Sequence, residues 1–318
     1  MRSVFLDFAT LSNGDLDTQI IERSAPGLTL LESTRQEEVA ERVAGHAIVM
    51  TNKLRIDRRI IERSPEMRLI ALSATGTNNI DLDAARERGI AVCNITDYCT
   101  PSVVQHVLGV LLHLTHHLAE YSREAVDGTW GRGQHFTILR HGIRELRGLT
   151  LGVVGWGVLG RAVAAACESA LGMRVIIANR PGGVPAVGRV DLDDLLRLAD
   201  VVTLHCPLTP TTTGMIDARR LGLMKPDAVL INTARGALID IDALVTSLRE
   251  GRLGGAAIDV LPQEPPVDGS PLFAPDLRNL IVTPHVAWGA IESRQRCLDE
   301  VAANVADWRV GGTRRRVV

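Results

Sequence analysis

Short apolar runs alternate with amphipathic segments throughout the first hundred residues. Three of the runs are SVFLDF from Ser3, AIVMTN from Ala47 and IAVCN from Ile90. Their apolar residues are consecutive rather than alternating, which is typical of strands buried on both faces, and strands separated by helices run parallel. The pattern predicts a doubly wound parallel β/α unit over residues 1–100.

A segment with apolar residues at helical spacing follows from Pro101 to Glu124. It predicts one helix of five turns or more, with Thr100 as its N-cap, that joins two domains. A second β/α series, with the runs LTLGVVG, VVTLHC and NLIVTPH, predicts another parallel sheet between about residues 148 and 285.

The last thirty residues, from Trp288, predict an amphipathic helix and a solvated basic tail at Arg314–Arg316. We expect this helix to pack on the first domain, which makes that domain discontinuous. The predicted fold is α/β with two doubly wound parallel-sheet domains, the first over residues 1–100 and 287–318, the second over residues 101–286.

Composition excludes several classes of protein. With 318 residues, 46% hydrophobic and 23% charged, the chain is not disordered or collagen-like. Its 35 basic and 37 acidic side chains form no block of like charge, so we expect no nucleic-acid partner. No apolar stretch is long enough for a membrane span or a secretory signal, so we expect a cytosolic protein. The five cysteines are odd in number and lack a C-x-x-C pair, which indicates reduced thiols.

A glycine motif, Gly155-x-Gly157-x-x-Gly160, directly follows the strand LTLGVV and opens a helix. In this context the pattern predicts a dinucleotide-binding turn. Gly155 permits the tight turn, Gly157 lets the pyrophosphate approach the backbone, and Gly160 lets helix and strand pack closely. The residues expected to surround the cofactor here are Gly155, Trp156, Gly157, Val158, Leu159 and Gly160.

The end of the second strand of this domain has Asn179 and Arg180 where an acid commonly binds the adenosine ribose. A carboxylate repels a 2′-phosphate, whereas Asn179 does not and Arg180 can pair with it. We therefore favour NADP(H) over NAD(H). The alternative is that Arg180 is a solvated loop cation and Asn179 binds an unphosphorylated ribose.

Other strands of the second domain end in polar residues: Cys206, the segment Asn232–Gly236, Asp259 and His285. Ligands of open α/β sheets bind at the carboxyl ends of strands, so these loops are expected to line one crevice. An arginine, a carboxylate and a histidine are what hydride transfer at a 2-hydroxy or 2-oxo acid requires. Each residue alone is weak support, because a histidine after a strand is more often a hydrogen-bonded loop residue.

The chain resembles the D-isomer-specific 2-hydroxyacid dehydrogenases through a series of motifs in matching order. These are the glycine motif, LHCPLTPTT (204–212), INTARGALID (231–240), DVLPQEPP (259–266) and TPHVAWG (283–289). Within the family, ATGTNNID (74–81), PSVVQH (101–106) and the His-Val-Ala-Trp ending resemble the glycerate dehydrogenase, or hydroxypyruvate reductase, branch. The resemblance implies a flavodoxin-like substrate domain and a Rossmann cofactor domain.

The resemblance also implies roles for particular residues. Arg235 would hold the substrate carboxylate and carbonyl, with His285 as acid/base and Glu264 as its partner. Asp259 would anchor the nicotinamide carboxamide, and the backbone at Thr75–Gly76 would receive the substrate carboxylate. Further residues expected to line the cofactor or substrate are Cys206, Pro207, Thr212, Thr233, Ala234 and Trp288.

The expected reaction is NAD(P)-dependent reduction of hydroxypyruvate or glyoxylate to the D-2-hydroxy acid. A phosphite or formate dehydrogenase on the same scaffold, or a non-catalytic NAD(H)-sensing protein similar to corepressors, is the alternative. Formate enzymes of this resemblance pair their histidine with glutamine, so Glu264 is evidence against that variant. We expect no metal at His113, His116 and His117, and a homodimer formed through the helix from Pro101 and the loop to Arg147.

Overall fold

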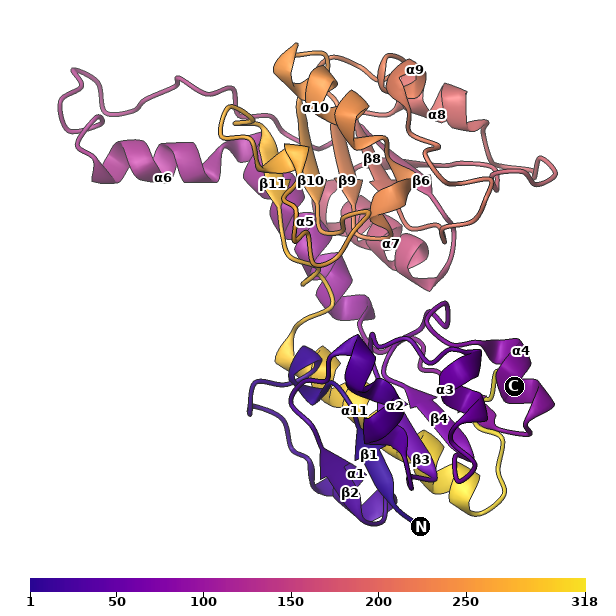
Figure 1. Cartoon of the computed structure of the whole chain (residues 1–318). Helices are drawn as coiled ribbons and strands as arrows, with labels where there is room; N and C mark the ends of the chain where they lie inside the picture. Colours follow the sequence, from indigo (N-terminus) through magenta and orange to yellow (C-terminus); the bar gives the residue numbers. More distant parts are fainter. The chain divides into compact units, whose positions relative to one another are not determined.

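The computed structural model describes all 318 residues, which divide into two compact units (Figure 1). Unit 1 comprises Met1–Cys99 with Gly289–Val318, and unit 2 comprises Thr100–Trp288. Both have a parallel sheet with helices on its faces, so the predicted fold class is confirmed. None of the helices is long and apolar enough to span a membrane.

Unit 1 contains a five-stranded parallel sheet in the order β2-β1-β3-β4-β5, which is the flavodoxin-like order. The order reverses direction between β1 and β3. Its core is built from buried aliphatic side chains of both the strands and the helices. The strands are β1 Ser3–Phe5, β2 Leu28–Leu30, β3 Ile48–Thr51, β4 Leu69–Leu72 and β5 Ala91–Cys93, and the helices are α1 Gln19–Ser24, α2 Val39–Val43, α3 Arg58–Glu62 and α4 Leu82–Glu87.

The carboxyl-terminal helix α11, Ile291–Arg309, belongs to unit 1 and packs against α1 and β4. Arg294 Nη2 forms an ion pair with Asp15 Oδ2 at 2.6 Å, and its guanidinium holds the pKa of Asp15 well below the usual value. The end of the tail pairs with β5, because Val317 N donates to Val92 O at 2.7 Å. Unit 1 is thus closed by residues from both ends of the chain.

Unit 2 contains a six-stranded parallel sheet in the order β11-β10-β9-β8-β6-β7, with its reversal between β6 and β8. Helices α5 and α7 cover one face, and α8, α9 and α10 cover the other (Figure 1). The strands are β6 Thr150–Val154, β7 Arg174–Ile177, β8 Val201–Leu204, β9 Val229–Asn232, β10 Gly255–Ile258 and β11 Leu280–Val282, and these helices are α5 Thr100–His116, α7 Val158–Leu171, α8 Leu192–Leu198, α9 Ala218–Leu221 and α10 Ile241–Arg249.

The single helix predicted from Pro101 to Glu124 is wrong, because the chain forms two helices. His117 adopts a left-handed conformation with φ 50°, which ends α5 before α6, Leu118–Val126, begins. The prediction of Thr100 as N-cap is also wrong, since Thr100 lies inside α5 and its buried hydroxyl has no hydrogen-bond partner. Apolar periodicity continues across the break, so the pattern could not reveal it.

Candidate active site

The strands of unit 2 end in register along one edge of the sheet. Leu204 pairs with Val154 and Asn232, and Ile258 pairs with Asn232 and Val282. The segments that follow these residues therefore begin at the same level of the sheet. This edge is the place where doubly wound sheets bind ligands.

Asp259, directly after β10, is buried and holds the segment that follows β11. Its Oδ1 accepts hydrogen bonds from Thr283 Oγ1 and, at 2.9 Å, from Val286 N. Its Oδ2 accepts one from Ala287 N at 2.9 Å, and its main-chain oxygen accepts one from His285 N at 2.8 Å. Asp259 thus positions the histidine loop, and its contact with a nicotinamide carboxamide stays a prediction.

His285 and Glu264 form a half-buried pair, with 2.7 Å between Nδ1 and Oε2. The second carboxylate oxygen, Oε1, accepts a hydrogen bond from Leu261 N at 2.8 Å, which fixes the glutamate. His285 has a φ of 56°, uncommon for a residue other than glycine, and Trp288 Nε1 donates to its carbonyl at 2.9 Å. Because Nδ1 faces the carboxylate, Nε2 is the ring nitrogen able to exchange a proton with a ligand.

Arg235 is exposed in a turn after β9 that Asn232 shapes. Asn232 Nδ2 donates to Arg235 O at 2.9 Å, and Asn232 Oδ1 accepts from Ala234 N at 3.0 Å. The next residue is Gly236, where a Cβ would lie 2.0 Å from the carbonyl carbon of Leu261. The absence of a side chain at Gly236 lets the arginine turn touch the segment that supports the His285–Glu264 pair.

The glycine turn lies at the β6/β8 reversal, where the chain is too tightly packed for side chains. A Cβ on Gly155, which has a φ of 104°, would lie 2.5 Å from Cys206 N. A Cβ on Gly160 would lie 2.0 Å from Gly155 O, whereas one on Gly157 would meet nothing within 4 Å. Two glycines therefore permit close packing, and Gly157 leaves open space beside the backbone.

Helix α7 begins at this turn with Gly157 as N-cap, and no side chain caps its first N–H groups. Free N–H groups and the positive end of the helix dipole favour an anion. Trp156, Val158 and Leu159 lie in the same turn, and Val158 is exposed. The arrangement fits the pyrophosphate of a dinucleotide.

The loops after β8 and β9 contain further residues proposed for the cofactor. Burial raises the pKa of the Cys206 thiol to about 11, so it is a neutral thiol at pH 7. Thr212 Oγ1 donates to Pro207 O at 2.9 Å and accepts from Thr209 N at 2.7 Å, so it braces its own loop. The buried Thr233 hydroxyl has no hydrogen-bond partner, which fits a donor that a bound nucleotide would satisfy.

Asn179, after β7, holds the loop that follows it. Its Nδ2 donates to Asp191 Oδ1 at 2.9 Å, and its Oδ1 accepts from Ala186 N at 3.0 Å. Asn179, Arg180 and Asp191 line a cavity of about 470 Å³. The side chain of Asn179 is thus occupied within the protein, and its contact with a cofactor stays a prediction.

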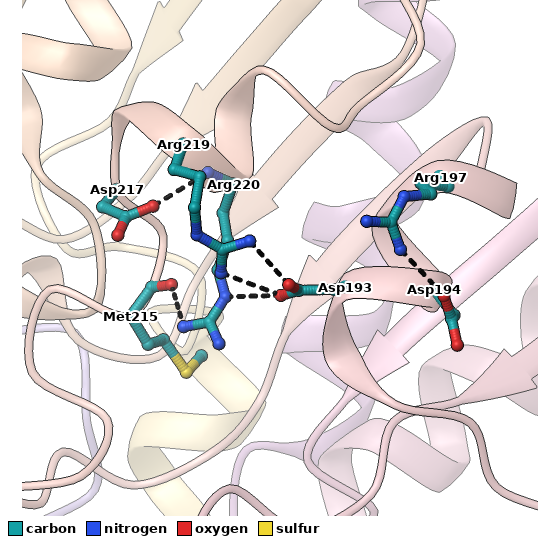
Figure 2. Close-up of polar contacts among 7 residues, drawn as sticks. All are labelled: Asp193, Asp194, Arg197, Met215, Asp217, Arg219 and Arg220. Atoms are coloured by element: carbon teal, nitrogen blue, oxygen red, sulfur yellow. Dashed lines mark hydrogen bonds and ion pairs between the residues drawn. The ribbon is translucent and has the colours of Figure 1, made fainter.

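Three arginines line this cavity, and two of them form ion pairs with neighbouring acids. Figure 2 shows Arg220 directed at Asp193 and Arg197 at Asp194, with distances of 2.9 Å and 2.8 Å between their closest atoms. Arg180 forms no ion pair or side-chain hydrogen bond. It is the lining cation that remains available for an anion.

Thr75 and Gly76 follow β4 in unit 1. Asn94 Nδ2 donates to Thr75 O at 2.8 Å, which ties this turn to the end of β5. Thr75 is exposed, and the N–H groups of the turn lie at the carboxyl edge of the sheet. The role of this turn in binding a carboxylate stays a prediction.

Sequence reasoning missed His205. Burial lowers its pKa to about 4, its Nε2 lies 2.9 Å from Thr203 Oγ1, and its Nδ1 has no partner. The signal was present, because Thr203 near the end of β8 and His205 directly after it are two positions apart in an otherwise apolar run. A neutral imidazole beside the glycine turn adds no charge to the pyrophosphate site.

The histidines considered for a metal contact neighbouring side chains. His116 Nδ1 lies 3.1 Å from Thr115 Oγ1, and the rings of His117 and His141 lie 5.5 Å apart. No group of three or more His, Cys, Asp or Glu side chains is arranged to hold a metal ion.

A doubly wound sheet with a glycine turn at its reversal and an Arg, Glu and His along the same edge defines the class of nicotinamide-dependent α/β dehydrogenases. Residues 108–287 match the family model of the D-isomer specific 2-hydroxyacid dehydrogenase NAD binding domain. The chain belongs to this family.

Similar proteins cover nearly the whole chain. It is 43% identical over 282 residues to a glycerate dehydrogenase of Methylorubrum extorquens, covering 89% of this chain and 88% of that protein. It is 34% identical to a hydroxypyruvate reductase of Blautia hydrogenotrophica, covering 98% of each. A solved NADPH-dependent glyoxylate/hydroxypyruvate reductase of Sinorhizobium meliloti, in complex with NADP and malonate, superposes with a TM-score of 0.80 at 26% identity, covering 100% of this chain and 97% of that one.

Proposed function

We propose that this chain reduces a small 2-oxo acid, hydroxypyruvate or glyoxylate, to the D-2-hydroxy acid with NAD(P)H. The observation that carries the proposal is the His285–Glu264 pair, joined at 2.7 Å on the edge that also holds Arg235 and the glycine turn. Relatives that act as glycerate dehydrogenase and hydroxypyruvate reductase support the substrate class.

The residues divide the chemistry between them. A bound reduced nicotinamide supplies the hydride. His285 donates a proton from Nε2 to the carbonyl oxygen of the substrate, and Glu264 balances the charge of the imidazolium before the transfer. Arg235 binds the carboxylate and polarises the carbonyl, which stabilises the developing negative charge. The backbone of Thr75–Gly76 supplies further donors to the carboxylate.

We infer a preference for NADP(H). Arg180 is the arginine of the adenosine-side cavity without an ion pair, and a guanidinium can pair with a 2′-phosphate. No carboxylate follows β7 directly to repel that phosphate. The solved relative bound to NADP supports the same choice.

We also infer a homodimer. Helix α6 and the segment after it extend from the rest of unit 2 as an arm (Figure 1), and several large apolar side chains on it are exposed. These are Leu118, Val126, Trp130, Phe136, Leu139 and Ile143. Apolar patches of this kind are typical of interfaces. Sedimentation of the protein at micromolar concentration is expected to give twice the mass of one chain, and a single-chain mass would contradict the dimer.

The deciding experiment for the activity is a panel of hydroxypyruvate, glyoxylate and pyruvate, each with NADH and with NADPH, together with formate and phosphite in the oxidative direction. Turnover of hydroxypyruvate or glyoxylate is expected, with NADPH preferred. Oxidation of phosphite or formate without turnover of any 2-oxo acid would assign the alternative reaction.

A further inference from the structure

Arg220 of the short helix α9 lines the same cavity of unit 2 as Arg180. Its Nε donates to Asp193 Oδ1 at 2.9 Å, and its Nη1 donates to Met215 O at 2.8 Å. Its Nη2 forms no hydrogen bond within the protein and is not enclosed by it. One end of the guanidinium fork therefore stays open, although the group as a whole is ion-paired.

The protein holds this guanidinium in one orientation. Figure 2 shows it between Asp193, which belongs to α8, and the main chain of Met215, which precedes α9. The main-chain N of Arg220 is fixed as well, because it donates to Asp217 Oδ1 at 2.8 Å. Only 28% of the side-chain surface is exposed, so the group has little freedom left to lose when it binds a ligand.

Asp193 faces a second guanidinium from the next residue along α9. Arg219 Nη1 lies 2.6 Å from Asp193 Oδ2, while Arg220 Nε lies 2.9 Å from Oδ1. Together the two arginines hold the pKa of this carboxyl well below its usual value, so Asp193 is ionised at neutral pH. One carboxylate balances only one of two guanidinium groups, and the cluster keeps one positive charge.

The other charged residues that line the cavity leave no excess of positive charge. Arg197 is paired with Asp194 at 2.8 Å. Arg180 and Asp191 have no ion-pair partner, and they are opposite in sign. The positive excess at this cavity therefore comes from the cluster of Asp193 with its two arginines.

The inferred preference for NADP(H), on which this inference rests, requires that excess. A 2′-phosphate carries up to two negative charges and three acceptor oxygens, and guanidinium groups bind such oxygens with charge-assisted hydrogen bonds. Arg180 alone is offset by Asp191, so a second cation is needed to favour the phosphate over a ribose hydroxyl.

We propose that Arg220 is this second cation and donates from Nη2 to the 2′-phosphate of NADP(H), with Arg180 bound to the same phosphate. Asp193 and Met215 position the guanidinium and leave Nη2 for the ligand. NAD(H) carries a hydroxyl at this place and gains little from the contact, so Arg220 acts on the choice between the two cofactors.

The test compares Arg220→Met with Arg219→Met in the full chain. Both variants remove one positive charge from the same carboxylate, but Arg219 does not line the cavity. The probes are adenosine 2′,5′-bisphosphate and 5′-AMP, measured by calorimetry, because they differ only in the 2′-phosphate and involve no turnover. Thermal unfolding checks that each variant is folded.

Arg220→Met should weaken binding of adenosine 2′,5′-bisphosphate about 10-fold, the effect of one hydrogen bond to a charged group. Binding of 5′-AMP should stay within about 2-fold, which also shows that the nucleotide site is intact. Arg219→Met should change neither ligand by more than about 2-fold, since the field of an exposed charge is screened. Arg220→Lys should recover only part of the loss, because an ammonium group lacks the fork that contacts Asp193 and phosphate together.

Three results would overturn the assignment of Arg220 while NADP(H) stays the preferred cofactor. They are an unchanged affinity for adenosine 2′,5′-bisphosphate in Arg220→Met, an equal loss for both ligands, and an equal loss in Arg219→Met. If the unsubstituted protein binds adenosine 2′,5′-bisphosphate no more tightly than 5′-AMP, the inferred preference for NADP(H) fails and this inference fails with it. Reduction of a 2-oxo acid with NADH would then still support the proposed activity.

Discussion

In each sheet the strand order changes direction at one point, but the residues at these two reversal points differ in chemistry. In unit 1 the residue two positions beyond β1 is Asp7, whose buried carboxylate accepts backbone hydrogen bonds from Asn52 and Lys53. In unit 2 the residue after β6 is Gly155, and helix α7 begins with N–H groups that no side chain caps. At the reversal point of unit 1 the backbone N–H groups bond to a side chain of the protein. At that of unit 2 the first N–H groups of α7 are left for a ligand.

The difference shows that one architecture can build its reversal point in two ways. A carboxylate at the reversal point fixes the loop of the neighbouring strand, because Asp7 accepts hydrogen bonds from the backbone N–H groups of Asn52 and Lys53. Glycines at the equivalent point admit an anion against the backbone. We therefore propose that the edge of unit 2 binds the nucleotide and supplies His285 and Arg235 for the reaction, while the edge of unit 1 adds backbone donors at Thr75–Gly76.

The largest expected effect is on the proton transfer assigned to unit 2. His285→Ala should lower kcat by about 10²- to 10⁴-fold, because a general acid is removed. The affinity for NADPH should stay nearly unchanged, since the lost group acts on the substrate oxygen. Steady-state kinetics and fluorescence titration with NADPH measure the two quantities.

The matched variant Glu264→Gln keeps the shape of the pair but removes its charge. It should lose less activity than His285→Ala, because the imidazole remains. Activity of His285→Ala within a few-fold of the unsubstituted enzyme would show that another group transfers the proton.

The next largest effect concerns the reversal point of unit 1, where Asp7 accepts the backbone hydrogen bonds. Asp7→Asn should lower the free energy of unfolding by roughly 2–4 kcal/mol, because an amide cannot accept all the buried hydrogen bonds that the carboxylate accepts. Asp57→Asn is the control, since its carboxylate accepts one bond, from Ile60 N at the start of α3, and should cost about 1 kcal/mol or less. Urea unfolding measures both, and equal losses would mean that Asp7 is an ordinary turn residue.

The glycine turn at the reversal point of unit 2 is tested by adding single methyl groups. Gly157→Ala should leave the free energy of unfolding within about 1 kcal/mol, since its Cβ meets no atom. It should weaken NADPH binding by roughly 5- to 30-fold, because the methyl group occupies the space that we assign to the pyrophosphate. Gly160→Ala should instead destabilise the fold, because its Cβ would overlap Gly155 O. Undiminished affinity in Gly157→Ala would place the pyrophosphate elsewhere.

The smallest effect concerns the adenosine side. Arg180→Ala should lower kcat/KM with NADPH by about 10-fold or less and leave NADH unaffected, because an exposed charge pair is weak. Added salt should diminish the advantage of NADPH in the unsubstituted enzyme. Arg197→Ala is the control, since Arg197 is paired with Asp194. An unchanged NADPH/NADH ratio in Arg180→Ala would contradict the inferred preference.

The structure also changes the choice of variant for this question. Asn179→Asp would reverse the preference if the position acted on the ribose alone. The side chain of Asn179 bonds Asp191 at 2.9 Å, so a second carboxylate there would repel Asp191 and disturb the loop. Arg180 is the cleaner position, because its side chain has no partner to lose.

The sequence by itself determined the fold class, because strands buried on both faces must be apolar at consecutive positions and each stands out from the helices between them. It also determined the glycine turn, whose residues lie within six positions of one another. Tertiary structure decided the break at His117, the binding of the histidine loop by Asp259, the Asn179–Asp191 contact and the support of Lys53 by Asp7. The hydrogen bonds among these features join residues that lie 12 to 46 positions apart in the sequence. The break at His117 comes from a left-handed backbone conformation with φ 50°. Local patterns specify which elements form, whereas a hydrogen bond between distant polar groups exists only after the folded backbone has brought donor and acceptor together.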